Sequence, residues 1–190
     1  MKSSLNGCTP LFHSIRGETV ESIHAGAVAV VNGDGKLIAS CGDPGVVTYL
    51  RSTAKPLQAL PFIENGGADH FGLTAQEIAI LCASHSGTDE HVRTLVGMQN
   101  KVGVHYSQLL CGIHPPYHQP SAALLADRGE QATQNHHNCS GKHTGMLAYS
   151  MMIDAPLDSY PDPQHPIQQK ILEGISEMCG INPDQVRIGI

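Results

Sequence analysis

The sequence of 190 residues contains no tryptophan and only three phenylalanines, and aromatic residues make up 4% of it. Its 11 lysine and arginine residues are outnumbered by 17 aspartate and glutamate residues, which gives a formal net charge of −6. Proteins that bind nucleic acids use basic surfaces, and those that bind single strands add aromatic side chains on which bases stack. The composition therefore argues against a nucleic-acid partner and against an anionic membrane surface.

Long hydrophobic runs are also absent, since none approaches the ~20 residues that a membrane-spanning helix requires. The first eight residues, MKSSLNGC, lack the apolar segment of a signal peptide. We therefore expect a cytoplasmic protein without membrane contacts. In that compartment the six irregularly spaced cysteines are expected to be thiols or metal ligands rather than disulfides.

What the sequence does contain is typical of a folded protein. Hydrophobic residues make up 41% and charged residues 15%, and 190 residues are enough for one substantial hydrophobic core. Residues 20–31 and 36–41 predict two strands, because the Asn32–Gly35 segment between them is a tight-turn sequence. Residues 186–190 alternate like a further strand. That strand ends the sequence, which fits either a natural edge strand or a shortened protein.

Helices are predicted between these strands from capping residues and from the positions of proline and glycine. Pro56 fits a helix only in its first turn, Thr74 and Glu77 form a capping-box pattern, and Thr88 is a suitable N-cap. Gly180 is a suitable C-cap for the last helix. The predicted helices cover residues 53–64, 74–83, a segment starting at 88, and residues 121–127, 142–152 and 167–179.

The most informative motif is a Ser-x-x-Lys tetrad formed by Ser52 and Lys55. Residues three apart share one face of a helix, so the Lys55 amine can approach the Ser52 hydroxyl. A serine hydroxyl becomes a useful nucleophile when an adjacent base accepts its proton, and lysine acts as that base when its pKa is lowered. Penicillin-recognising acyl-transferases use this arrangement. A lone tetrad also occurs by chance, so further motifs are needed.

A second polar stretch covers residues 82–87 and includes Ser84 and His85. It follows a predicted helix, and the nearby helix that starts at Thr88 could offer backbone N–H groups to an oxyanion. Ordinary helix capping is the alternative explanation for this stretch.

A third stretch, residues 135–145, packs histidines, a cysteine and a lysine at the start of a predicted helix. Cys139 and His143 are zinc ligands by residue type. Two alternatives are a nucleophilic Cys139 beside His136 or His143, and a polar capping loop. It is not a phosphate-binding P-loop, because His136 stands where that motif requires glycine.

Taken together, these stretches resemble the rhizobial-type L-asparaginases, the asparaginase II family. The resemblance extends over nearly the whole sequence and includes five blocks in the same order. These are Val20-Glu21-Ser22 with His24 and Gly26, the Arg51–Gln58 run, Ala83–Gly87, Cys111-Gly112 with His114-Pro115-Pro116, and Asn138–His143.

The resemblance implies an α/β fold similar to that of serine β-lactamases and glutaminases, with a sheet, packed helices and the Ser52 helix at the floor of a cleft. It also implies a homodimer that hydrolyses L-asparagine to L-aspartate and ammonia through an acyl-enzyme. Ser52 matches the nucleophile, Lys55 its base and Ser84 the serine of a second serine–lysine pair. Arg51 and His143 match residues that flank the site.

By the same resemblance, Cys139 and Lys142 match two ligands of a zinc ion that positions substrate. A lysine ligand is unusual because it must bind as the neutral amine. Relatives continue past this sequence with an Asp-Gly-Cys-Gly stretch that supplies a third ligand, and the lysine of the second pair lies further on. We therefore expect residues 1–190 to be the N-terminal portion of a single catalytic domain, incomplete at its C-terminus.

Two other functions fit the same motifs. One is a glutaminase or β-lactam-binding protein on the same scaffold. The other is an inactive remnant that binds metal or pairs with a homologue.

Overall fold

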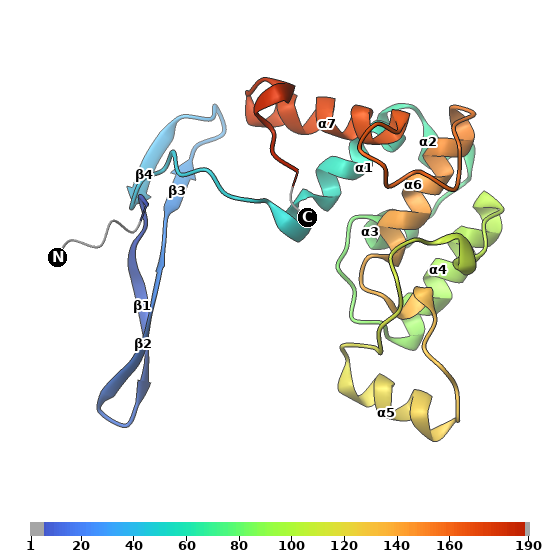
Figure 1. The fold of residues 1–190 in the computed structure, drawn as a ribbon, viewed down its shortest axis with the longest axis horizontal. Coiled ribbons are helices and arrows are strands. Elements are labelled where there is room, and N and C mark those ends of the chain that lie inside the picture. The colour runs from blue at the N-terminus through green and yellow to red at the C-terminus, as the bar shows by residue number, and fades with distance from the viewer. Residues whose placement is uncertain (1–5, 189–190) are drawn as a thin grey trace. The chain divides into compact units, whose positions relative to one another are not determined.

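The computed structural model describes residues 6–188 and divides into two compact units, Met1–Tyr49 and Leu50–Ile190. The first unit holds small antiparallel sheets and the second holds helices (Figure 1). Within the described residues there are seven α-helices, so the expected α/β class is confirmed. No helix in that range is long and apolar enough to span a membrane.

The first unit consists of two β-hairpins. Strand β1 (Thr9–Arg16) pairs with β2 (Thr19–Gly26), and β3 (Val28–Val31) pairs with β4 (Leu37–Cys41), both antiparallel. The predicted turn at residues 32–35 is confirmed, and the Asn32 side-chain oxygen accepts backbone N–H groups from Asp34 and Lys36.

The single predicted strand over residues 20–31 was wrong. The first of the two strands ends at Gly26 and the second begins at Val28, so β2 and β3 belong to different hairpins. Strand β1 was not predicted, because its apolar residues do not alternate strictly and Pro10 lies near its start.

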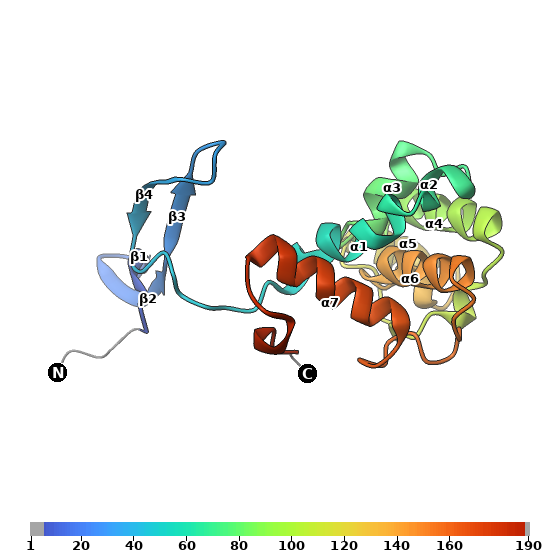
Figure 2. The same ribbon diagram turned by 90° about the horizontal axis from the view of Figure 1, so that it is seen from above.

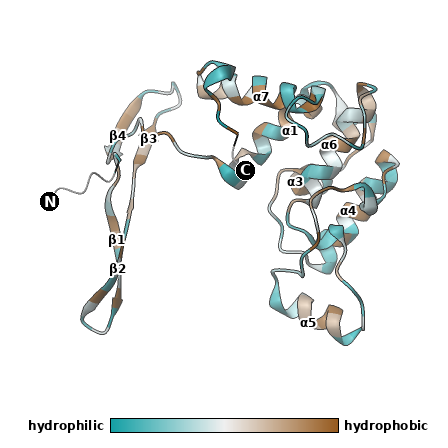
Figure 3. Ribbon diagram, viewed as in Figure 1, coloured by the Kyte–Doolittle hydropathy of each residue, from teal (hydrophilic) through white to brown (hydrophobic). Residues whose placement is uncertain are grey.

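None of the described residues of the first unit is buried. Figure 3 shows hydrophobic stretches along β3 and β4, where Ile38 is 62% exposed. A two-stranded sheet has no second layer against which to bury such side chains. The hydrophobic core among the described residues therefore lies in the second unit.

The second unit is a packed group of helices. Their bounds are α1 Lys55–Glu64, α2 Gly67–His70, α3 Ala75–Leu81, α4 Asp89–Val102, α5 Gln119–Asp127, α6 Ser140–Met152 and α7 Pro166–Cys179. Helix α6 contacts α1, α3, α4 and α7, and ten of its residues are buried. In both views α1 and α7 lie side by side (Figure 2). Helix α6 is thus the central element of this unit.

The helix ends follow the sequence signals closely. Pro56 lies in the first turn of α1, after a short 3₁₀ turn at Arg51–Ala54. Thr74 and Glu77 form the expected capping box, and Thr88 caps α4 by accepting the His91 backbone N–H. The second predicted helix was too long by two residues, since α3 ends at Leu81. The short α2 was not predicted.

Glycines allow α6 to approach α3 closely. A β-carbon added at Gly141 would lie 2.2 Å from the Ile80 carbonyl oxygen, and one at Gly145 would lie 2.8 Å from the Leu81 side chain. A clash with backbone cannot be relieved by rotating a side chain. The Gly141 position therefore fixes how closely the first turn of α6 lies to the end of α3.

The predicted strand over residues 186–190 was wrong for its described part. Residues 186–188 are neither strand nor helix and follow a 3₁₀ turn at Pro183–Gln185, while residues 189 and 190 lie outside the described range. Among the described residues, both sheets belong to the first unit. A strand at residues 186–188 therefore has no partner strand in its own unit.

Candidate functional site

The Lys55 amine is the centre of the candidate site. Lys55 begins α1 and is only 2% exposed. Its Nζ lies 2.6 Å from the Ser84 hydroxyl oxygen, 2.8 Å from the Ala83 carbonyl oxygen and 3.1 Å from the Asn138 carbonyl oxygen. These three partners belong to the second and third polar stretches of the sequence. The fold thus brings all three sequence motifs together at one nitrogen atom.

The partners of Lys55 suit a neutral amine as well as an ammonium ion. Carbonyl oxygens only accept hydrogen bonds, so the Ala83 and Asn138 carbonyls take two N–H hydrogens. A neutral amine then has a lone pair left, which can accept the hydrogen of the Ser84 hydroxyl. The geometry therefore allows a proton to pass between Ser84 and Lys55.

The electrostatic surroundings favour the neutral amine. Burial lowers the pKa of Lys55, and the charge of Lys142 lowers it further. The Cys139 side chain acts in the opposite direction, both by its charge and through a hydrogen bond. The net direction is downward, as a lysine that serves as a base requires.

Ser52 lies one 3₁₀ turn before Lys55 and is exposed. Its carbonyl oxygen accepts the Lys55 backbone N–H, and no hydrogen bond joins the Ser52 hydroxyl to any described residue. The expected contact between the Ser52 hydroxyl and the Lys55 amine is thus not made in this structure. Arg51, just before Ser52, has a φ of 51°. Backbone in this left-handed region is costly for a residue other than glycine and recurs at functional sites.

The Ser84 loop is fixed by the neighbouring His85, which is 4% exposed. The Gly87 backbone N–H donates to His85 Nδ1, so the neutral ring carries its hydrogen on Nε2 and donates it to Ser140 Oγ at 2.7 Å. The Ser140 hydroxyl in turn donates to the Asn135 carbonyl. Burial lowers the pKa of His85 to about 4, so the ring is neutral near pH 7. This chain of bonds ties the loop after α3 to the start of α6.

Gly87 closes the same loop. Its φ of 73° is left-handed, and an added β-carbon would lie 2.8 Å from the His136 carbonyl oxygen and 3.1 Å from Pro116 Cα. Three loops, which contain Ser84, Pro116 and His136, therefore converge here. In the sequence these three loops belong to separate motifs.

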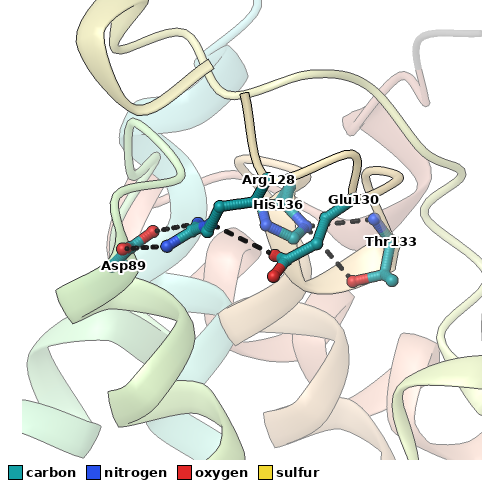
Figure 4. A network of polar contacts seen from close by, with 5 residues as sticks. All are labelled: Asp89, Arg128, Glu130, Thr133 and His136. Carbon is teal, nitrogen blue, oxygen red and sulfur yellow. Dashed lines mark hydrogen bonds and ion pairs between the residues drawn. The ribbon is translucent and has the colours of Figure 1, made fainter. Parts of the chain in front are cut away.

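Polar contacts among Asp89, Arg128, Glu130, Thr133 and His136 lie near the loop that precedes α6 (Figure 4). Arg128 forms two hydrogen bonds to the Asp89 carboxylate, and an ion pair with Glu130. Nearby, His136 Nδ1 accepts the Thr133 backbone N–H at 3.0 Å. Burial lowers the pKa of His136, while Asp89 and Glu130 act to raise it. The ion pairs join the start of α4 to the end of α5, and the loop that leads to Cys139 interacts with them only electrostatically, through His136.

Cys139 is the N-cap residue of α6 and Lys142 lies in the first turn of that helix, three residues further on, and both are partly buried. Both interact electrostatically with Lys55, and the Cys139 backbone N–H donates to His137 Nδ1. A thiolate and a neutral amine are donors that zinc accepts. Within residues 6–188, however, no three His, Cys, Asp or Glu side chains assemble into a metal site. The expectation that Cys139 and Lys142 bind zinc therefore stays a prediction.

His143 follows these residues on α6 and is 9% exposed. Its Nδ1 lies 2.6 Å from the Tyr160 hydroxyl oxygen. Burial, together with the smaller effects of the charges of Lys142 and His137, lowers the pKa of His143 to about 3. The ring is therefore neutral at neutral pH.

Sequence reasoning missed Cys111 as a residue of this site. Cys111 interacts electrostatically with Cys139, Lys142 and Lys55, and burial raises the pKa of its thiol to about 11. One signal for it was present, since Cys111 and Gly112 stand among the blocks that resemble the family. His114 is a second such residue, because its Nε2 accepts the Asn138 backbone N–H.

A narrow cavity between α1, α6 and α7 is lined by both Lys55 and Lys142. Its volume of about 10 Å³ suits about one water molecule, so an amino acid does not fit. Ser52 and Ser84 are both exposed, whereas the Lys55 amine is buried. These two residues are therefore accessible from solvent.

Comparison with protein families gives one match. The model of the L-asparaginase II family matches residues 12–190, which is nearly the whole chain. Comparison with curated proteins finds no match.

Proposed function

Because this chain belongs to the L-asparaginase II family, we propose that it carries the chemistry that hydrolyses L-asparagine to L-aspartate and ammonia. One observation carries the proposal at the site. It is the 2.6 Å contact between a buried lysine amine, whose pKa is lowered by burial, and an exposed serine hydroxyl. An amine held next to a hydroxyl is the pairing that nucleophilic acyl transfer requires.

In the proposed mechanism the Ser52 oxygen attacks the side-chain amide carbon of asparagine. Its proton passes to Ser84 while the Ser84 proton passes to Lys55, so one hydroxyl relays the charge between nucleophile and base. Lys55 then gives the proton to the leaving nitrogen, the C–N bond breaks and ammonia departs. Water hydrolyses the resulting ester by the same route in reverse. Ser52 would approach Ser84 with substrate bound, since catalytic hydrogen bonds often tighten only then.

A zinc ion is part of the proposal only as an aid to substrate binding. Cys139 and Lys142 would supply two of its ligands. When bound, the ion would attract substrate oxygen atoms and orient the amide. In the steps above, the attack, the relay and the departure of ammonia depend on Ser52, Ser84 and Lys55 alone.

The test measures ammonia release from L-asparagine by the wild-type chain and by Ser52→Ala, Ser84→Ala and Lys55→Met. Loss of Ser52 should abolish both turnover and the trapped acyl-enzyme, which mass spectrometry detects. Loss of Ser84 should slow acylation by about 10²–10⁴-fold without moving the acyl group. The matched control is Ser86→Ala, an exposed serine of the same loop, which should retain full activity.

Three outcomes would contradict parts of this proposal. An acyl group found on Ser84 would make Ser84 the nucleophile. Full activity in Lys55→Met would remove lysine from the mechanism. Faster turnover of glutamine than of asparagine would assign the chain to glutamine instead.

A further inference from the structure

Tyr160 is the most deeply buried aromatic residue next to the site, and it is 0% exposed. Its hydroxyl oxygen lies 2.7 Å from the Leu110 backbone nitrogen and 2.6 Å from His143 Nδ1. The rings of Tyr160 and His143 meet edge to face at 5.5 Å. One hydroxyl thus joins the loop that contains Cys111 to the helix that contains Lys142.

The direction of these two hydrogen bonds follows from their donors. A backbone N–H can only donate, so the Tyr160 oxygen accepts from Leu110. The Tyr160 hydrogen then needs an acceptor, and His143 Nδ1 is the only remaining partner of that hydroxyl among the described residues. If Nδ1 carried a hydrogen, the fully buried phenol hydrogen would be left unpaired, which costs about 1–3 kcal/mol. Tyr160 therefore donates to Nδ1.

We propose that Tyr160 is a positioning residue that holds His143 in the tautomer with its hydrogen on Nε2. This inference rests on the proposed function for its catalytic consequence. His143 Nε2 has no hydrogen-bond partner among the described residues. In this tautomer it presents an N–H donor to an oxygen atom of the substrate, either of a carboxylate or of the amide. The same tautomer has no lone pair at Nε2, so His143 serves neither as a metal ligand nor as a base for Cys139.

Nuclear magnetic resonance can read the tautomer without any activity. Protein labelled with ¹⁵N-histidine should give His143 signals with a protonated Nε2 and an unprotonated Nδ1, assigned by their absence in His143→Gln. In Tyr160→Phe the ring should become a mixture of both tautomers. The matched control is Tyr149→Phe, which removes another buried hydroxyl of the same unit, one that accepts from Asn65 instead. It should leave the His143 signals unchanged.

Kinetics supply the second readout. Tyr160→Phe should raise KM for asparagine by about tenfold and change kcat less, since one substrate hydrogen bond is misdirected. Tyr149→Phe should change neither constant. His143→Gln should retain more activity than His143→Asn, because the glutamine amide places its N–H where Nε2–H stood.

The outcomes separate this inference from the proposed function. A wild-type spectrum with the hydrogen on Nδ1 would overturn the positioning role, even if Tyr160→Phe failed to fold. An unchanged KM in a folded Tyr160→Phe would overturn it as well. If no variant and no wild-type protein released ammonia, the proposed function would fail while the tautomer could still be read from the spectrum.

Discussion

The amine nitrogen of Lys55 lies 2.6 Å from the hydroxyl oxygen of Ser84, a residue 29 positions further along the chain. Lys55 lies at the start of α1, and Ser84 lies in the loop after α3. The Ser-x-x-Lys spacing by itself pairs Lys55 with Ser52. The fold instead places the amine between two segments, and this makes Ser84 its direct hydroxyl partner.

Replacing Gly141 with alanine should strongly destabilise the protein. The added methyl group would lie 2.2 Å from the Ile80 carbonyl oxygen, so α6 must move away from α3. Overpacking of this kind costs about 1–3 kcal/mol or more. Chemical denaturation should show a lower free energy of unfolding.

Gly174→Ala is the matched control, because Gly174 lies inside α7 and its added methyl group meets no atom within 4 Å. That change should stabilise α7 by about 0.5–1 kcal/mol. Equal stabilities for the two variants would disprove the close contact between α6 and α3.

Acid should destabilise the protein through His85. The pKa of His85 is about 4 in the folded protein because of its burial, and ~6.5 in the unfolded chain. Between these values the unfolded chain binds more protons, so the free energy of unfolding falls as pH falls from 6.5 to 4. The loss is at most about 3 kcal/mol and ends near pH 4.

Unfolding curves at pH 4, 5, 6 and 7 would measure this effect. In His85→Gln the slope between pH 4 and 6.5 should be smaller. His13→Gln changes an exposed histidine of β1 and should keep the wild-type slope. An unchanged slope in His85→Gln would mean that His85 is not held neutral.

Lys101→Met should lower the free energy of unfolding, because it removes the charged partner of buried Glu77. Glu77 is 5% exposed and lies 2.7 Å from Lys101 Nζ. Burial alone would raise the pKa of Glu77, but hydrogen bonds from Lys101 and Thr74 outweigh burial and lower it. Without Lys101 the carboxylate loses its charged partner, at a cost of about 1–3 kcal/mol. Thermal unfolding at pH 7 should show the loss.

The control for this variant is Lys170→Met, which breaks the exposed pair of Lys170 and Glu173. Exposed ion pairs contribute little to stability, so its melting temperature should stay close to that of the wild type. If both variants melted alike, the Glu77 pair would be no stronger than a surface pair.

The exposed cysteines should react with a thiol reagent faster than the more buried ones. The thiolate is the reacting form, and burial raises the pKa of Cys111 to about 11 and raises that of Cys82. Cys41 and Cys179 are exposed. At pH 8, mass spectrometry after brief treatment with iodoacetamide should find label on Cys41 and Cys179 well before Cys111 and Cys82. Rapid labelling of Cys111 would contradict its burial beside Cys139.

Most helix ends, the turn at residues 32–35 and the family were predictable from the sequence. Helix ends at Thr74, Thr88 and Gly180 depend on hydrogen bonds or backbone angles within a few residues, so they are readable from neighbouring residues. The hairpin at residues 32–35 was readable for the same reason. The order of the polar motifs was enough to indicate the family.

Which side chains come into contact became evident only from the folded arrangement. The Lys55–Ser84 contact, the Gly141–Ile80 approach and the Tyr160–His143 hydrogen bond each join segments distant in sequence. The division between β2 and β3 likewise depends on which strand each one pairs with. Such contacts follow from how helices and loops pack around a common core. A local pattern of residues cannot encode the distance between two side chains that come together only on folding.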